Sequence, residues 1–257
     1  MTCVPAKRHA IVPAIDDPSA LLIFGGNDGL ERYVLRKPEG LTGYAIGPNG
    51  DQAAVMTDDG IVRFYDAFGE NIARVRLPQY APPRDDEQQS ARLFIGDDEQ
   101  VIVSLGRHKR LPRQDHEWRP YQPAPVQYLT WHVTADGKSR VLDHELVSGA
   151  VFLDKRCVVI IDGPETAAPT ASNDRWQMTW YDVPGKRAWQ VSFSDRPWLA
   201  SKKSRDGVTV RLPGHWPLSF SAEGQPTIRP PDVEALQKSH PDYVGRARTL
   251  YEREDLP

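Results

Sequence analysis

The stretch Gly43–Val75 reads GYAIGPNGDQAAVMTDDGIVRFYDAFGENIARV and contains the pattern that decides the fold. The apolar runs at this place in the chain have the length and composition of short strands: Leu41–Ile46, Ala53–Thr57 and Ile61–Asp66. Turn signals lie between and after them: Pro48-Asn49-Gly50, Asp58-Asp59-Gly60 and Ala67-Phe68-Gly69. Because Asn-Gly and Asp-Gly supply the positive φ that tight hairpins need, the stretch predicts a meander of antiparallel strands.

Comparable units precede and follow this stretch, and five of them can be traced, with irregular spacing, from Ala20 to Arg229. Their third strands align best, because each has an aromatic residue ahead of a turn glycine: Val62–Asp66 with Gly69, Tyr128–His132 with Gly137, and Met178–Asp182 with Gly185. One such unit cannot bury its own faces, whereas radial repetition buries both faces of every sheet against its neighbours. The alternative, a pair of β-sandwiches, would show the same turn spacing.

The segment Ala45–Asp66 resembles a single blade of the WD40-like β-propeller family. The likeness is carried by the Pro48-Asn49-Gly50 turn, the Asp59-Gly60 turn and the strand end Phe64-Tyr65-Asp66. The resemblance implies an all-β fold, a β-propeller of about five four-stranded antiparallel blades. The Trp-Asp dipeptide that marks WD40 blades is absent, so the resemblance implies a fold and not a functional subgroup.

The tail has a different character from the rest of the chain, and we expect two parts: a β-propeller-like domain over 1–230 and a C-terminal helical extension over 231–257 packed on it. Asp232 and Ser239 are candidate N-caps of helices in the tail. The apolar residues that follow fall close to one helical face: Tyr243, Ala247, Leu250 and Tyr251.

Composition limits the compartment and the kind of partner. The 257 residues are 39% hydrophobic, enough for a core, and the formal net charge of −3 produces no field that favours nucleic acid or an anionic membrane. Cys3 and Cys157 offer neither a disulfide framework nor a four-ligand zinc pattern. Together with the lack of a signal peptide or bilayer-spanning run, these features predict a soluble, cytoplasmic protein.

The long insertion Gly106–Pro125 interrupts a predicted β unit and is the strongest candidate for a recognition surface. Arginine and aromatic residues are the types enriched where interfaces carry their binding energy. The residues expected to contact a partner are Arg107, Lys109, Arg110, Arg113, Trp118, Arg119 and Tyr121.

The leading hypothesis is a non-enzymatic, protein-binding β-propeller without a cofactor. An inhibitor, such as a bacterial immunity protein acting on a toxin, and an assembly scaffold within a complex are both compatible with it. The seven histidines lack the spacing of metal hydrolases, and no Gly-rich phosphate loop or nucleophile elbow occurs. We therefore expect another protein as the partner, and no membrane.

Two other functions remain open. A propeller hydrolase or lyase with a metal site would need His116, Asp115 or His215 to meet in space. A nucleic-acid-binding module would use the basic 107–119 loop, although acidic residues inside the loop partly cancel its charge. A second basic patch, Lys202–Arg205, resembles a charged turn that protects a sheet edge.

Overall fold

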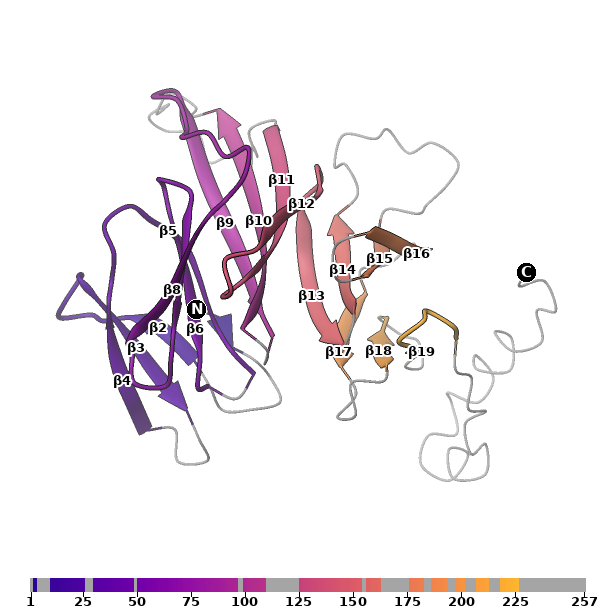
Figure 1. Ribbon diagram of the computed structural model, residues 1–257, viewed down its shortest axis with the longest axis horizontal. Coiled ribbons are helices and arrows are strands. Elements are labelled where there is room, and N and C mark those ends of the chain that lie inside the picture. The colour runs from indigo at the N-terminus through magenta and orange to yellow at the C-terminus, as the bar shows by residue number, and fades with distance from the viewer. Residues whose placement is uncertain are drawn as a thin grey trace, which may run out of the picture.

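The computed structural model describes most of the chain up to Pro226, and every regular element in that part is a strand (Figure 1). The described residues are 2–3, 10–25, 30–48, 50–96, 99–109, 125–153, 156–162, 176–182, 186–193, 197–201, 207–212 and 218–226. They contain no helix long and apolar enough to cross a bilayer. The predicted helical extension over 231–257 lies outside these residues and stays a prediction.

The strands form five antiparallel sheets, which we number as blades 1 to 5. Blade 1 contains β1 (Thr2–Cys3), β2 (Ala10–Pro13), β3 (Ala20–Gly25) and β4 (Leu30–Arg36). Blade 2 contains β5 (Leu41–Ile46), β6 (Ala53–Thr57), β7 (Ile61–Tyr65) and β8 (Asn71–Arg76). Blade 3 contains β9 (Glu87–Ile95), β10 (Gln100–Lys109), β11 (Pro125–Thr134) and β12 (Ser139–Asp143). Blade 4 contains β13 (Val147–Leu153), β14 (Arg156–Asp162), β15 (Trp176–Asp182) and β16 (Lys186–Phe193).

Blade 5 has three described strands, β17 (Trp198–Ser201), β18 (Gly207–Arg211) and β19 (Leu218–Ser221). Within every blade the strands pair in chain order, so each sheet is a meander. The first strands of blades 2 to 5, namely β5, β9, β13 and β17, pack on one another in series. This arrangement confirms the predicted all-β propeller, with its strands ordered from the inside of each blade outward.

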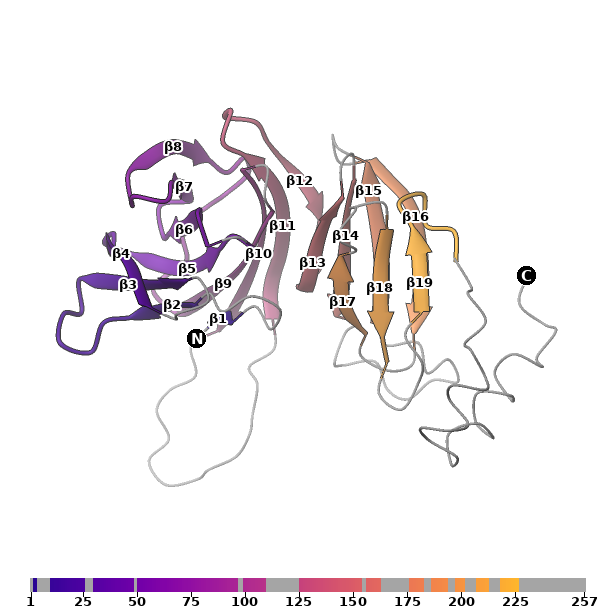
Figure 2. The same cartoon turned by 90° about the horizontal axis from the view of Figure 1, so that it is seen from below.

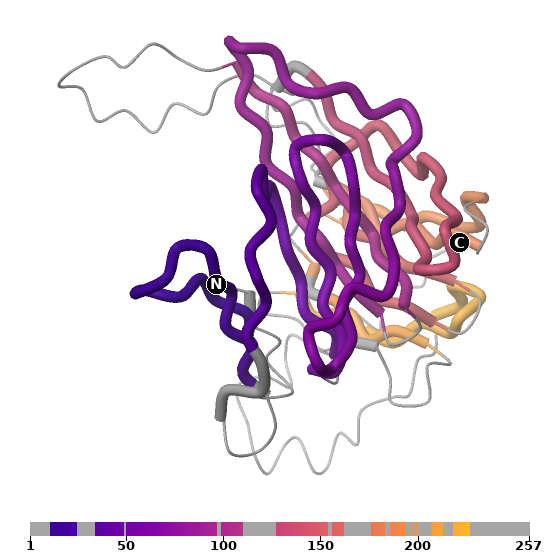
Figure 3. The backbone as a smooth tube through the Cα atoms, turned by 60° about the vertical axis from the view of Figure 1, so that its left-hand side comes forward, coloured from indigo at the N-terminus to yellow at the C-terminus, as the bar shows by residue number. Residues whose placement is uncertain are grey.

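The five blades follow one another along an arc. Figure 3 shows the chain passing from one meander to the next, from indigo to yellow, with neighbouring meanders side by side. In both Figure 1 and Figure 2, the described strands of blades 1 and 5 lie on opposite sides of blade 3. The described strands therefore form an open series of interfaces, in which blade 2 contacts blades 1 and 3, and blade 4 contacts blades 3 and 5.

Each interface between neighbouring blades has its own hydrophobic cluster. Strand β6 shows why the middle strands are mostly apolar: all five of its residues are buried, and four of them are apolar. Ala53 and Val55 join the cluster shared with blade 1, while Ala54 and Met56 join the cluster shared with blade 3. Because successive side chains point to opposite faces, a strand covered on both sides is apolar wherever no polar partner is at hand, and the one polar side chain of β6, Thr57, is hydrogen-bonded to Asp59.

The turns predicted at Asp58-Asp59-Gly60 and Ala67-Phe68-Gly69 are confirmed, and the first shares a detailed hydrogen-bond pattern with the turn at Gly137. The Thr57 hydroxyl donates to the Asp59 carboxylate at 2.5 Å, and the Ile61 amide donates to the same carboxylate at 3.2 Å. Thr134, Asp136 and Lys138 repeat these contacts in blade 3. The glycines in these turns, Gly60 and Gly137, have φ values of 75° and 93°, which only glycine adopts without strain.

We predict that two buried tryptophans differ in what their indole N–H contributes. Trp131 Nε1 donates to the Pro78 carbonyl at 2.9 Å, whereas Trp180 Nε1 is buried without a hydrogen-bond partner among the described residues. Trp131→Phe should therefore lower the free energy of unfolding by about 1–2 kcal/mol more than Trp180→Phe, since only the first change breaks a hydrogen bond. Urea unfolding of both variants measures this difference, and an equal or larger cost for Trp180→Phe would contradict it.

Candidate functional site

The predicted recognition loop begins later and ends earlier than the sequence indicated. Residues 106–109, expected in the insertion, belong to β10 and pair on both sides, since Arg107 faces Gln89 on β9 and Gln127 on β11. Pro125 is the first residue of β11 and pairs with His108. The expectation of a loop from Gly106 to Pro125 is thus wrong at its two ends, because backbone pairing with the neighbouring strands extends the hairpin. The remaining segment, 110–124, leaves from and returns to this end of the sheet.

Five of the seven predicted partner-binding residues lie outside the described part of the chain: Arg110, Arg113, Trp118, Arg119 and Tyr121. The other two, Arg107 and Lys109, lie on β10 but have different environments. Arg107 is buried, with 6% of its surface exposed, whereas Lys109 is exposed. Only Lys109 is presented to solvent as the sequence hypothesis required.

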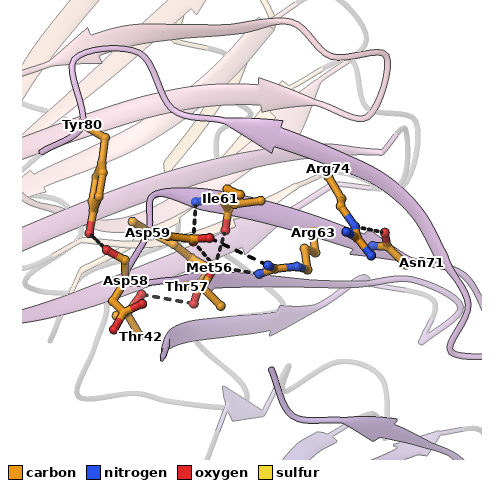
Figure 4. Close-up of polar contacts among 10 residues, drawn as sticks. All are labelled: Thr42, Met56, Thr57, Asp58, Asp59, Ile61, Arg63, Asn71, Arg74 and Tyr80. Carbon is orange, nitrogen blue, oxygen red and sulfur yellow. Dashed lines mark hydrogen bonds and ion pairs between the residues drawn. The ribbon is translucent and has the colours of Figure 1, made fainter. Parts of the chain in front are cut away.

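The Arg107 guanidinium is occupied by contacts within the protein. It donates to the Ala81 carbonyl and, at 3.3 Å, to Gln127 Oε1, and it lies 5.5 Å from the centre of the Tyr80 ring. Tyr80 in turn donates its hydroxyl to the Asp58 carbonyl (Figure 4). Arg107 thereby fastens the connector 77–86, which joins blades 2 and 3, to the base of the β10–β11 hairpin.

A hollow of about 740 Å³ lies at the opposite end of blade 3, beside the turn between β11 and β12. Its lining includes His132, Gln100 and Arg140, which share one face because Arg140 pairs directly with His132. His132 Nε2 is 3.0 Å from Gln100 Oε1, and only 5% of His132 is exposed. Burial, together with the nearby Arg140 charge and against a smaller opposing effect of Asp136, lowers the pKa of His132 from 6.5 to about 4, so the imidazole is neutral at pH 7. The sequence offered no signal for this site, since His132 stands in an ordinary strand pattern.

Polar contacts also join blade 4 to both of its neighbours. Asp143 of blade 3 accepts a hydrogen bond from Tyr181 at 2.5 Å and one from Arg187 at 2.8 Å, both on blade 4. Burial and the nearby Asp143 raise the pKa of the Tyr181 hydroxyl, which therefore stays protonated as a donor. Arg156 of blade 4 contacts Asp182 at 2.6 Å and donates to the Ala222 carbonyl of blade 5 at 2.8 Å. These contacts hold blades together.

The described residues contain no group of three or more His, Cys, Asp or Glu placed to hold a metal ion. The residues of the hypothetical metal site, Asp115, His116 and His215, lie outside the described part. Cys157 is buried between blades 3 and 4, and burial raises the pKa of its thiol to about 12. This thiol is therefore protonated at neutral pH and is a poor nucleophile.

No protein-family model matches the sequence, and no curated protein matches it either. Among solved structures, the chain is similar to the β-propeller domain of Cps50 (Swd1) from Myceliophteria thermophila, with 12% identity, a TM-score of 0.46, and coverage of 83% of this chain and 62% of that one. It is also similar to hydrazine synthase from Kuenenia stuttgartiensis, with 15% identity, a TM-score of 0.48, and coverage of 90% and 64% of the two chains. The chain spans less than two thirds of each structure. The assignment of a propeller rests on this chain's own sheet order and interfaces.

We predict that Arg107 is required for the conformation of the connector. Arg107→Gln should lower the free energy of unfolding by about 1–3 kcal/mol, because the Ala81 carbonyl loses its charged donor. The same change should accelerate limited trypsin cleavage after the exposed Arg84. Lys109→Gln is the matched control and should change the free energy of unfolding by no more than about 0.5 kcal/mol. Unchanged cleavage at Arg84 in Arg107→Gln would contradict this role.

We predict that His132 makes the fold sensitive to mild acid. The pKa of His132 is about 4 in the folded protein, against an ordinary value of 6.5 for an exposed histidine. Between these two pH values the unfolded chain therefore takes up a proton at His132 that the folded protein does not. The free energy of unfolding should therefore fall by up to about 3 kcal/mol as the pH drops through this window. His132→Gln should make the dependence shallower in urea unfolding between pH 7 and pH 4.5. The same flattening in His144→Gln, which removes an exposed imidazole, would contradict the assignment.

Proposed function

We propose that this protein is a protein-binding β-propeller whose recognition surface lies at the end of the β10–β11 hairpin. The surface comprises the exposed Lys109 and the side chains of segment 110–124, chiefly Arg110, Arg113, Trp118, Arg119 and Tyr121. The observation that carries the proposal is the support beneath this segment. A hairpin paired on both sides of β10 and fastened by Arg107 to the connector gives the segment a fixed base.

A fixed base favours binding in a physical sense. Association costs the entropy of ordering the groups that form the interface, and a rigid attachment lowers that cost. Arginine and aromatic side chains then supply large contact areas and charge-assisted hydrogen bonds. In this proposal Arg107 positions the segment and does not contact the partner, because its guanidinium is already used inside the protein.

Two finer roles fit a propeller of this kind. The partner is either a toxin that the protein inhibits, as a bacterial immunity protein does, or a subunit of a complex for which the protein is a scaffold. Both roles require a stoichiometric complex with another protein. They differ in whether the partner loses an activity when it binds.

We predict that replacing residues 110–121 with a Gly-Ser linker of equal length abolishes capture of the partner. The test is affinity capture from the cells that express the protein naturally, followed by calorimetry with the purified partner. Because the linker removes the anchoring side chains, affinity should fall by at least about a hundredfold.

The matched control replaces the other basic segment, Lys202–Arg205, with Gly and Ser. This control should leave the affinity unchanged, since it removes the same number of basic side chains, three, from another blade. Full affinity in the 110–121 variant, or equal losses in both variants, would overturn the proposal. Nuclease-sensitive capture would instead favour the nucleic-acid hypothesis.

A further inference from the structure

The outer face of blade 2 places two like charges directly opposite each other. Arg63 on β7 and Arg74 on β8 are register partners in the antiparallel ladder, and Arg76 opposes Ile61 two residues further along. Like charges at directly opposed positions destabilise a sheet. The arrangement therefore costs stability in the isolated protein unless something else satisfies these arginines.

The arginines lie on the part of this face that blade 1 leaves open. Blade 1 packs on the inner part of blade 2, where Val55 and Tyr65 contribute to the shared cluster. On the rest of this face, Arg63 on β7 is partly exposed, and Arg74 and Arg76 on β8 are exposed. Strand β8 is the outermost strand of blade 2. Its outer edge pairs with no other described strand, and only the Arg76 carbonyl at the end of β8 accepts a described side-chain hydrogen bond there, from Ser139 Oγ of blade 3 at 3.2 Å.

Figure 4 shows the two guanidinium groups turned away from each other. Arg63 Nη1 donates to Thr57 Oγ1 at 2.6 Å and Arg63 Nη2 lies 3.9 Å from Asp59 Oδ2, at one end of the hairpin. Arg74 Nε donates to Asn71 Oδ1 at 2.9 Å, at the other end. Among the described residues, no carboxylate forms an ion pair with Arg74 or Arg76. Within the described part of the chain, their positive charge is therefore not neutralised by an ion pair.

Apolar side chains accompany this charge on the same hairpin. Ile72 lies on the same face as Arg74, two residues away along β8, and is 45% exposed. Phe68, in the turn between β7 and β8, is 83% exposed. An exposed phenylalanine and an exposed isoleucine on the same hairpin leave apolar surface in contact with water. This contact is unfavourable, and a bound partner would remove it.

We propose that the outer face of the β7–β8 hairpin binds an extended acidic segment of a partner protein, which pairs along the free edge of β8. Carboxylates of the segment would lie opposite Arg74 and Arg76, and an apolar side chain would cover Ile72. Main-chain hydrogen bonds along an open sheet edge provide affinity in this mode, while alternate side chains provide specificity. A carboxylate beside Arg74 also offsets its repulsion with Arg63.

The geometry fixes the sequence pattern of the bound segment. Ile72, Arg74 and Arg76 alternate along β8, so the residues that contact them must also alternate along the bound segment. The segment therefore has two acidic residues separated by one position, and an apolar residue two positions before the first of them. A protein segment fits better than a nucleic acid for two reasons. The protein has a formal net charge of −3, and Phe68 and Ile72 offer apolar contacts that a phosphate backbone cannot use.

This surface goes beyond the proposed function, since it uses no residue of the β10–β11 hairpin or of segment 110–124. Arginine on an edge strand is also a means by which sheets avoid pairing with other chains. The two roles predict opposite results with an acidic peptide. If the arginines only protect the edge, the peptide does not bind, whereas the proposed role requires that it binds.

The test uses a fluorescein-labelled peptide, Leu-Thr-Glu-Thr-Glu-Thr, in fluorescence anisotropy with the full-length protein. The expected result is saturable binding at concentrations up to about 1 mM, with no binding of Leu-Thr-Lys-Thr-Lys-Thr. Arg74→Glu should lower the affinity for the acidic peptide by at least about tenfold, because it replaces electrostatic attraction with repulsion. Arg74→Lys should retain most of the affinity.

The same variant has a second readout that separates lost binding from lost folding. Arg74→Glu should raise the Tm by about 1–2 °C, since it converts a repulsive cross-strand pair into an attractive one. The matched control is Arg211→Glu on β18, another exposed arginine, which should leave peptide binding unchanged.

Three outcomes with the unaltered protein and with Arg74→Glu would overturn the proposal. They are absence of binding at about 1 mM peptide, equal affinity in Arg74→Glu and the unaltered protein, and displacement of the peptide by a single-stranded oligonucleotide. Peptide binding that persists in the 110–121 linker variant supports this surface even where the proposed function fails. Peptide binding that disappears in that variant would assign the peptide to the β10–β11 end and overturn the present inference.

Discussion

Burial of both faces of every inner sheet is the constraint on which this structure depends. A meander of short strands has two apolar faces, and no helix among the described residues covers them, so each described blade is stabilised by the next one. The continuous burial of β6 shows the constraint at its most stringent, since Ala53 and Ala54 are adjacent and belong to different clusters. A polar side chain at either position would be desolvated without a partner.

Polar contacts then fix how neighbouring blades meet. Trp131 reaches across to the Pro78 carbonyl, Asp143 receives Tyr181 and Arg187, and Arg156 reaches the Ala222 carbonyl. Each of these side chains satisfies a backbone or charged group near a blade boundary. Apolar clusters are tolerant of small shifts, whereas directional hydrogen bonds are not, so these contacts give the interfaces a defined register.

The sequence predicts the fold well because the turns and the aromatic positions are local signals. The glycine turns set the hairpins, and the aromatic residues that identified the repeats are buried: Phe64 and Trp180 face the following blade, while Trp131 and Tyr181 face the preceding one. The candidate site is predicted less well, because composition does not reveal pairing. Arg107 reads as an exposed charge, yet the strand pairing of β10 turns it toward Ala81, and the Arg63–Arg74 juxtaposition depends on a register that only the structure shows.

The open series of interfaces has a consequence for how the molecule loses its structure. In a closed ring every blade has two neighbours, and detaching any one of them breaks two contacts at once. Along the arc of described blades, an end blade is held by one interface, so loss of order is expected to fray inward from blades 1 and 5, with the junction of blades 2 and 3 melting last. Cooperativity is then that of a linear chain of coupled units.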